Sequence, residues 1–199
     1  FTTTFGRAQT VRIALLITLW PVLNGFIAGV RRRVMTAVLL IGVVATVSVS
    51  GHAVSTSPMV LGVALDSIHL LAIGSWIGGL CVLVFVSRRL DDERTLSLTN
   101  RFSGIAQWSL PVVVLTGVGQ TWLLVSDVTK IFDTQFGRTL VVKLALVLVI
   151  VELSGSARRA LKRRDVANLR TTVVFEVFIA LVVIALTASL TGLSPKAVS

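Results

Sequence analysis

MVLGVALDSIHLLAIGSWIGGLCVLVFVS, the stretch Met59–Ser87, is the longest apolar block of this sequence. A helix that crosses the hydrocarbon core of a bilayer needs about 20 predominantly apolar residues. The block exceeds that length and contains only two strongly polar ionisable groups, Asp66 and His69. It therefore predicts a helix that spans a membrane and holds two polar side chains within its length.

Shorter apolar blocks lie on either side of this stretch. The chain as a whole is 54% hydrophobic and 14% charged, with a mean hydropathy of +0.91, which indicates lipid as its solvent. We predict an all-α fold, a polytopic bundle of about six transmembrane helices that forms one domain over residues 1–199. Besides Met59–Ser87, the predicted spans are Val11–Val30, Val34–Ser50, Phe102–Val125, Thr139–Ala157 and Thr171–Gly192.

Basic residues give the chain a net charge of +10 and are expected in the connections that follow the first, third and fifth spans. Alternate connections lie on one side of a membrane, and an excess of Lys and Arg marks that side as cytosolic. The segment around His52 and the C-terminus are then expected on the outer side. The basicity is explained by membrane topology, so nucleic acid is not expected as a partner. These clusters are Arg31–Arg33; Arg88, Arg89, Arg94 and Arg101; and Arg158, Arg159, Lys162, Arg163, Arg164 and Arg170.

Small residues recur at helical spacing in two of the predicted spans. Gly25 and Gly29 form one pair, and Gly74 and Gly78, extended by Gly79, form another. Such pairs let two membrane helices approach closely. We expect them at helix contacts, with the third span near the centre of the bundle.

Candidate ligands for a metal ion lie toward the outer side. Asp66 and His69 are three residues apart and share a helix face, so the carboxylate can orient the imidazole. His52 and His69 are equally far along the chain from Arg33 and Arg88, which puts both about 28 Å above the basic side. Met59 lies further out and offers a thioether to a soft ion. The sequence predicts a metal site formed by His52, His69, Asp66 and Met59.

Other interpretations of these polar residues remain open. Asp66 and His69 can form a structural hydrogen-bonded pair, and two histidines at one depth also suit a haem with two axial imidazoles. Glu152 and Glu176 can pair with Arg158 or Arg170, or they can form an inner acidic step of an ion path. No nucleotide-binding loop or phosphorylation signature is visible, so an ATP-driven pump is not supported. The chain is not expected to be an enzyme.

Several motifs are spread along nearly the whole chain, and the third span carries the stretch DSIHLLAIGSWIGGL, residues 66–80. The other motifs, in their order along the chain, are Gly51-His52-Ala53, Arg101-Phe102-Ser103, Phe136-Gly137-Arg138 with Lys143-Leu144-Ala145-Leu146, and Ala185-Leu186-Thr187-Ala188. Together these motifs resemble the CopD copper resistance family, in which the third-span stretch is a signature helix. Ser156-Ala157-Arg158 departs from the family's common Asn-Arg.

The resemblance implies a multi-pass protein of the bacterial cytoplasmic (inner) membrane that handles copper, in uptake, resistance and homeostasis. It implies movement of Cu(I) or Cu(II) inward, beside or fused to a periplasmic or extracellular CopC-type copper-binding domain. Family members have about eight spans, and this chain begins with Phe1 rather than Met, so we expect it to be a truncated form. Three alternatives stay open: a membrane haem protein for electron transfer, a copper-delivery or assembly factor without transport, and a structural or interaction subunit that binds neither copper nor haem.

Overall fold

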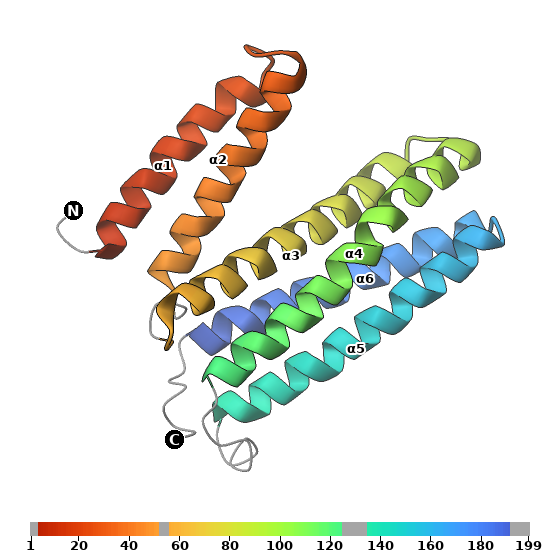
Figure 1. The fold of residues 1–199 in the computed structure, drawn as a ribbon. Coiled ribbons are helices and arrows are strands. Elements are labelled where there is room, and N and C mark those ends of the chain that lie inside the picture. Colours follow the sequence, from red (N-terminus) through yellow and green to blue (C-terminus); the bar gives the residue numbers. More distant parts are fainter. Residues whose placement is uncertain (1–3, 52–55, 125–134, 192–199) are drawn as a thin grey trace. The chain divides into compact units, whose positions relative to one another are not determined.

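The computed structural model describes residues 4–51, 56–124 and 135–191 and shows an entirely helical architecture in them (Figure 1). The predicted all-α class is confirmed. The chain packs as two compact units, Phe1–Leu71 and Ala72–Ser199, and α3 continues from the first into the second. The helices are α1 (Thr4–Leu23), α2 (Gly29–Ser50), α3 (Met59–Ser87), α4 (Asp92–Leu124), α5 (Gln135–Lys162) and α6 (Val166–Thr191). That residues 1–199 form a single domain stays a prediction.

Five of these helices, α2 to α6, are long and apolar enough to cross a membrane by length and composition. The remaining helix, α1, does not reach that level because Arg7, Gln9 and Arg12 lie in its first half. Large apolar side chains point outward, including Trp108, 76% exposed, and Trp122, 82% exposed. An outer surface of this kind fits a hydrocarbon solvent and not water.

In the first unit, α1 and α2 form an antiparallel hairpin. The chain turns between Leu23 and Gly29, where Gly25 and Gly29 adopt positive φ angles of 89° and 67°. These glycines therefore make the turn, and the prediction that they pack two helices together was wrong. The predicted span Val11–Val30 was also misplaced, because the turn divides it. The close approach of the two helices lies instead at Gly42, which faces the side chain of Leu15.

The basic clusters lie largely within helices, contrary to the expectation that they occupy connections. Arg31–Arg33 are in α2, Arg94 and Arg101 are in α4, and Arg158 and Arg159 are in α5. The apolar blocks mark only the parts of the helices suited to lipid, and the helices continue past them. Only α3 has the predicted bounds, Met59–Ser87.

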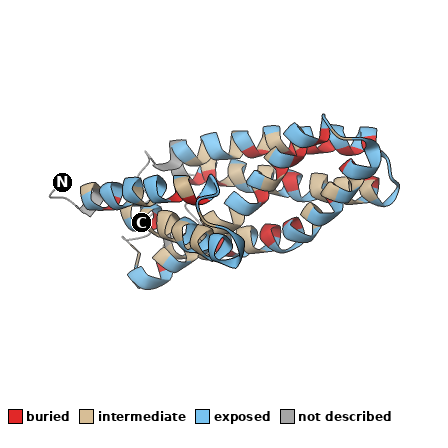
Figure 2. Ribbon diagram, turned by 90° about the horizontal axis from the view of Figure 1, so that it is seen from above, coloured by how far each residue is buried: buried red, intermediate tan, exposed pale blue. Residues whose placement is uncertain are grey.

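The second unit contains the larger core, formed where the second half of α3 packs with α4, α5 and α6. Figure 2 shows buried positions on the facing sides of these helices and exposed positions on their outer sides. Leu80 is fully buried, and Leu169 on α6 is 1% exposed. The core residues are Trp76, Leu80 and Leu83 of α3, Ala106 and Leu110 of α4, Ile150 and Ala160 of α5, and Leu169, Val173 and Ala180 of α6.

The α3–α4 contact depends on one glycine. A Cβ atom added at Gly79 would overlap the ring of Phe102, so the ring lies directly on the α3 backbone. Gly74 and Gly78 have open space around them, and no atom lies within 4 Å of an added Cβ. The prediction that this pair forms a helix contact was wrong, and Gly79 alone of the three has that role.

Two aspartates begin helices at the basic end of this unit, the end at which the α3–α4 and α5–α6 turns lie. Asp91 accepts a hydrogen bond from the backbone N–H of Arg94, and Asp165 accepts one from Asn168. Aspartate at this position satisfies backbone donors that a helix leaves unpaired at its start. The two caps explain why α4 and α6 begin several residues before their apolar blocks.

Candidate functional site

The first unit holds the part of the predicted metal site that the structure describes. Asp66 and His69 lie in α3, with His69 only 8% exposed and Asp66 half-buried. Their spacing of three residues places them on one helix face. Met59 is the first residue of α3, and its side chain is 51% exposed. The helix thus carries a half-exposed thioether at its start and a buried imidazole beyond it.

His52 lies outside the described residues, so its place beside His69 stays a prediction. Within residues 4–51, 56–124 and 135–191, no three His, Cys, Asp or Glu side chains gather in a group that could hold a metal. The described ligand candidates are therefore His69, Asp66 and Met59 on a single helix. A site of ordinary coordination number needs at least one further ligand from another segment.

A hydrogen bond between two hydroxyl groups joins α3 to α2 next to these residues. Ser67 Oγ donates to Ser48 Oγ across 3.1 Å, and Ser48 is completely buried. Ser67 lies between Asp66 and His69 in the chain. The bond therefore fixes α3 against the last turns of α2 at the level of the predicted metal ligands.

Arg12 is a residue of this unit that the sequence interpretation missed. Its guanidinium donates to the carbonyl oxygen of Thr46 and to Ser50 Oγ, both at 2.9 Å, and its Nε donates to Thr46 Oγ1 at 3.2 Å. A planar guanidinium can satisfy several acceptors at once in this way. Arginine inside an apolar block was the available signal, because such a residue needs internal partners in lipid.

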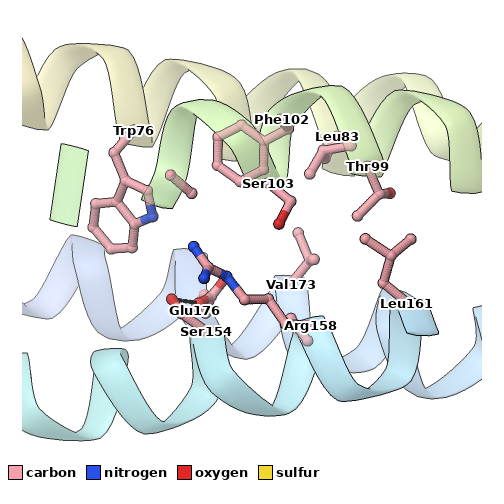
Figure 3. A pocket seen from close by; sticks show the side chains of 12 residues that line it. Trp76, Leu83, Thr99, Phe102, Ser103, Ser154, Arg158, Leu161, Val173 and Glu176 are labelled. Atoms are coloured by element: carbon pink, nitrogen blue, oxygen red, sulfur yellow. Dashed lines mark hydrogen bonds between the residues drawn. The ribbon is translucent and has the colours of Figure 1, made fainter. Parts of the chain in front are cut away.

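The second unit contains a small, mostly apolar cavity between α3, α4, α5 and α6, with a volume of about 30 Å³ and a few polar groups in its lining. Glu176 of α6 is 2% exposed, and Ser154 of α5 donates a hydrogen bond to its Oε1 atom. Figure 3 shows the side chain of Arg158 extending toward this carboxyl group. In the described part of the chain, the charged residues that line the cavity are Glu176 and Arg158.

Trp76 closes the cavity on the α3 side. Its side chain is buried, and its Nε1–H has no hydrogen-bond acceptor among the described residues. In Figure 3 the indole nitrogen faces the interior of the cavity. A buried donor of this kind is normally satisfied by a partner, and an internal water molecule is a common one.

An open groove of about 650 Å³ runs along α4 and α5 next to the cavity. Ser103, Arg158 and Leu161 line both the cavity and the groove. These three side chains therefore separate the buried carboxyl group of Glu176 from the open groove. The remaining groove residues are Glu93, Leu96, Ser97, Asn100, Gln107, Lys162 and Arg164.

The prediction that Glu152 and Glu176 pair with Arg158 or Arg170 was wrong. Glu152 forms its ion pair with Arg159, at 3.1 Å, and not with Arg158 or Arg170. Arg170 instead donates to the carbonyl oxygens of Ser87 and Leu90 and contacts Asp92. Glu176 bonds to Ser154, with Arg158 lining the same cavity.

The long apolar helices, and the polar groups held between them, define a multi-pass helical membrane protein. A family model described as CopD, copper resistance protein D, matches residues 96–190. The copper transport protein CutJ of Bacillus subtilis (strain 168) is 24% identical over 122 residues. These two findings confirm the predicted resemblance of this chain to the CopD family.

The extent of these matches matters for the site. The alignment with CutJ covers 59% of this chain but only 23% of that protein's length. The residues matched by the family model, 96–190, include Glu176 and Arg158 and begin after His52, Asp66 and His69. No solved structure matches the chain.

Proposed function

We propose that this chain handles copper and moves copper ions across the cytoplasmic membrane, in uptake or resistance. One observation carries the proposal, namely a buried imidazole, His69, on an apolar helix next to a carboxylate on the same face. The similarity to a copper resistance family and to a copper transport protein supports copper as the metal. Polar ionisable groups within a membrane helix are costly and commonly serve function.

The proposed chemistry begins with a copper ion that arrives at the start of α3. Met59 offers a transient thioether contact there, and His52 and His69 then bind the ion through imidazole nitrogens. Asp66 accepts the second ring N–H of His69 and thereby keeps the other nitrogen available as a ligand. Two imidazoles suit Cu(I) in a linear arrangement, and an added oxygen ligand suits Cu(II).

The proposed route leads along α3 from its Met59 end toward the basic end. The face that carries Gly74 and Gly78 has open space beside it, which leaves room for an ion to pass. We assign the basic end to the cytosol, because Lys and Arg accumulate on that side of membrane proteins. A CopC-type copper-binding protein or domain would deliver the metal on the opposite side.

Copper content and an optical spectrum of the protein in lipid nanodiscs test the site. We expect about one copper ion per wild-type chain and loss of that copper in the double variant His52→Ala, His69→Ala. Ile68→Ala is the matched control, because Ile68 is exposed and adjacent to His69. Full copper binding by the double variant, with thermal stability unchanged, would overturn the site.

Uptake of copper into sealed vesicles then separates the remaining possibilities. Uptake that the double variant loses supports transport. Copper binding without uptake would make the chain a delivery or assembly factor. A Soret band that disappears in the double variant would assign the two histidines to haem.

A further inference from the structure

We propose that Glu176 is a proton-binding site inside the α3–α6 bundle and that it exchanges its proton with the groove along α4 and α5. The site is separate from the histidines, and the proposal does not rest on a role in copper movement. It joins three observations: a buried carboxyl group, a cavity with an unsatisfied donor, and an open groove one side chain away.

The burial of Glu176 limits the states that its carboxyl group can adopt. A carboxyl group away from water is stable as a neutral acid or as a carboxylate that faces a cation. The cavity supports both forms, because Ser154 can exchange hydrogen bonds with the acid and Arg158 can neutralise the carboxylate. A reversible proton site requires that both the neutral acid and the carboxylate of Glu176 have partners, and the cavity provides them.

The ligand chemistry of the cavity favours a proton over a metal ion. Its polar lining consists of one carboxyl group, hydroxyl groups, the indole N–H of Trp76 and the guanidinium of Arg158. Among the residues that the structure describes, no His, Cys or Met lines the cavity, and the fixed positive charge of Arg158 repels a metal cation. A volume of about 30 Å³ also restricts the occupant to about one or two water molecules.

The path for the proton follows from the shared lining of cavity and groove. A water molecule that accepts the Trp76 N–H would lie beside Glu176, and Ser103, Arg158 and Leu161 separate it from the open groove. On uptake, a hydronium ion in the groove loses a proton along this water, and a new O–H bond forms at Glu176. The carboxylate becomes a carboxylic acid, and Arg158, still protonated, loses its counter-charge and can turn toward the groove that it also lines.

Infrared spectroscopy of the protein in lipid nanodiscs, with ¹³C-labelled glutamate carboxyl groups, tests this proposal. The chain contains three glutamates, and the other two, Glu93 and Glu152, are exposed and paired with Arg164 and Arg159. We expect a labelled C=O band of a neutral acid that disappears reversibly as the pH is raised and shifts in D₂O. The band should remain in the double variant Glu93→Gln, Glu152→Gln, where Glu176 is the sole glutamate.

Two variants assign the band and test the role of the arginine. Glu176→Gln should lose the band while keeping an acceptor for Ser154. Arg158→Gln should increase the band at neutral pH by about twofold or more, because the carboxylate loses its counter-charge.

Three outcomes would overturn the proposal. The first is the absence of a neutral-acid band at every pH in the double variant, which would make Glu176 a permanent structural carboxylate. The second is a band that responds to neither pH nor D₂O, which would mean that Glu176 stays protonated and does not exchange its proton with the groove. The third is an unchanged band in Arg158→Gln, which would remove the arginine from the site.

Discussion

The hydroxyl group of Ser67 on α3 donates to the hydroxyl group of Ser48 on α2 across 3.1 Å, at a point where Ser48 is completely buried. Hydrogen bonds between membrane helices typically contribute about 0.6 kcal/mol, with an upper range near 2 kcal/mol. We predict that Ser48→Ala or Ser67→Ala lowers the free energy of unfolding by about 1 kcal/mol. Thermal unfolding in detergent measures this loss.

The double variant Ser48→Ala, Ser67→Ala and a control test whether the loss comes from the bond between these two serines. Removal of both hydroxyl groups should cost little more than removal of one, because each single change already breaks the shared bond. Thr18→Val is the control, since Thr18 bonds to Ala14 of its own helix. Fully additive losses for the two serines would show that the bond does not couple α2 to α3.

Adjacent glycines on α3 should respond in opposite directions to the same substitution. Gly79→Ala places a methyl group against the Phe102 ring, and we expect a loss of about 1 to 3 kcal/mol in stability. Gly78→Ala has open space and should be neutral or stabilising by up to about 1 kcal/mol, because alanine favours helix formation.

A second substitution identifies the cause of the loss. Phe102→Ala in the Gly79→Ala background removes the overlap, so the two changes together should cost less than the sum of their separate effects. Denaturant titration of the four variants in one detergent provides the comparison. Equal effects at Gly78 and Gly79 would contradict the described α3–α4 contact.

Arg12 should stabilise the last turns of α2 through its guanidinium. Arg12→Gln removes donors to Thr46 and Ser50, and we predict a stability loss of about 2 kcal/mol. Arg12→Lys should lose nearly as much, because an ammonium group cannot reproduce the fork of donors. Hydrogen exchange of residues 46–51, read by mass spectrometry, should accelerate in both variants.

The control for Arg12 lies on the same helix. Arg7 is exposed in the first part of α1, and Arg7→Gln should leave the exchange of residues 46–51 unchanged. Equal acceleration in both glutamine variants would indicate a general effect of charge on the hairpin instead of the specific bonds.

Arg170 should hold the turn between α3 and α4. It donates to the carbonyl oxygen of Ser87, the last residue of α3, at 3.2 Å and to that of Leu90, in the turn that follows, at 3.4 Å. We predict that Arg170→Ala lowers stability by about 1 to 2 kcal/mol, because those carbonyl oxygens lose a charged donor. Thermal unfolding measures the change, and Arg163→Ala, at an exposed turn residue, should have little effect.

The sequence predicted the helical class and the bounds of α3, because one uninterrupted apolar block ends at Pro58 on one side and at Arg88 on the other. It misplaced the start of α4 by ten residues, since a search for apolar blocks does not see a polar helical extension. The cap at Asp91 was a usable signal for that start. The Asn24-Gly25 pair was a similar signal for the turn that divides the first predicted span.

The candidate sites were harder to predict, because contacts between helices depend on how each helix is rotated. Spacing alone placed Asp66 and His69 on one face of one helix. It could not show that Arg12 reaches Thr46, or that Ser154 meets Glu176, since those residues are far apart in the chain. Glu176 was recognised as costly in lipid, but the two predicted roles, an ion pair with arginine and an acidic step of an ion path, both missed its bond to Ser154.

The bonds of Arg12 also bear on how the first hairpin enters a bilayer during synthesis. An arginine at the centre of a membrane helix costs about 3 kcal/mol during insertion by the translocon, and α1 is the helix that falls short in apolarity. The oxygen atoms that accept hydrogen bonds from the Arg12 guanidinium belong to α2, so Arg12 gains these partners only when α2 is present. We therefore expect α1 to remain outside the hydrocarbon until α2 emerges from the ribosome. The two helices should then partition into lipid together. Glycosylation-site mapping of chains that end before and after α2 measures this order.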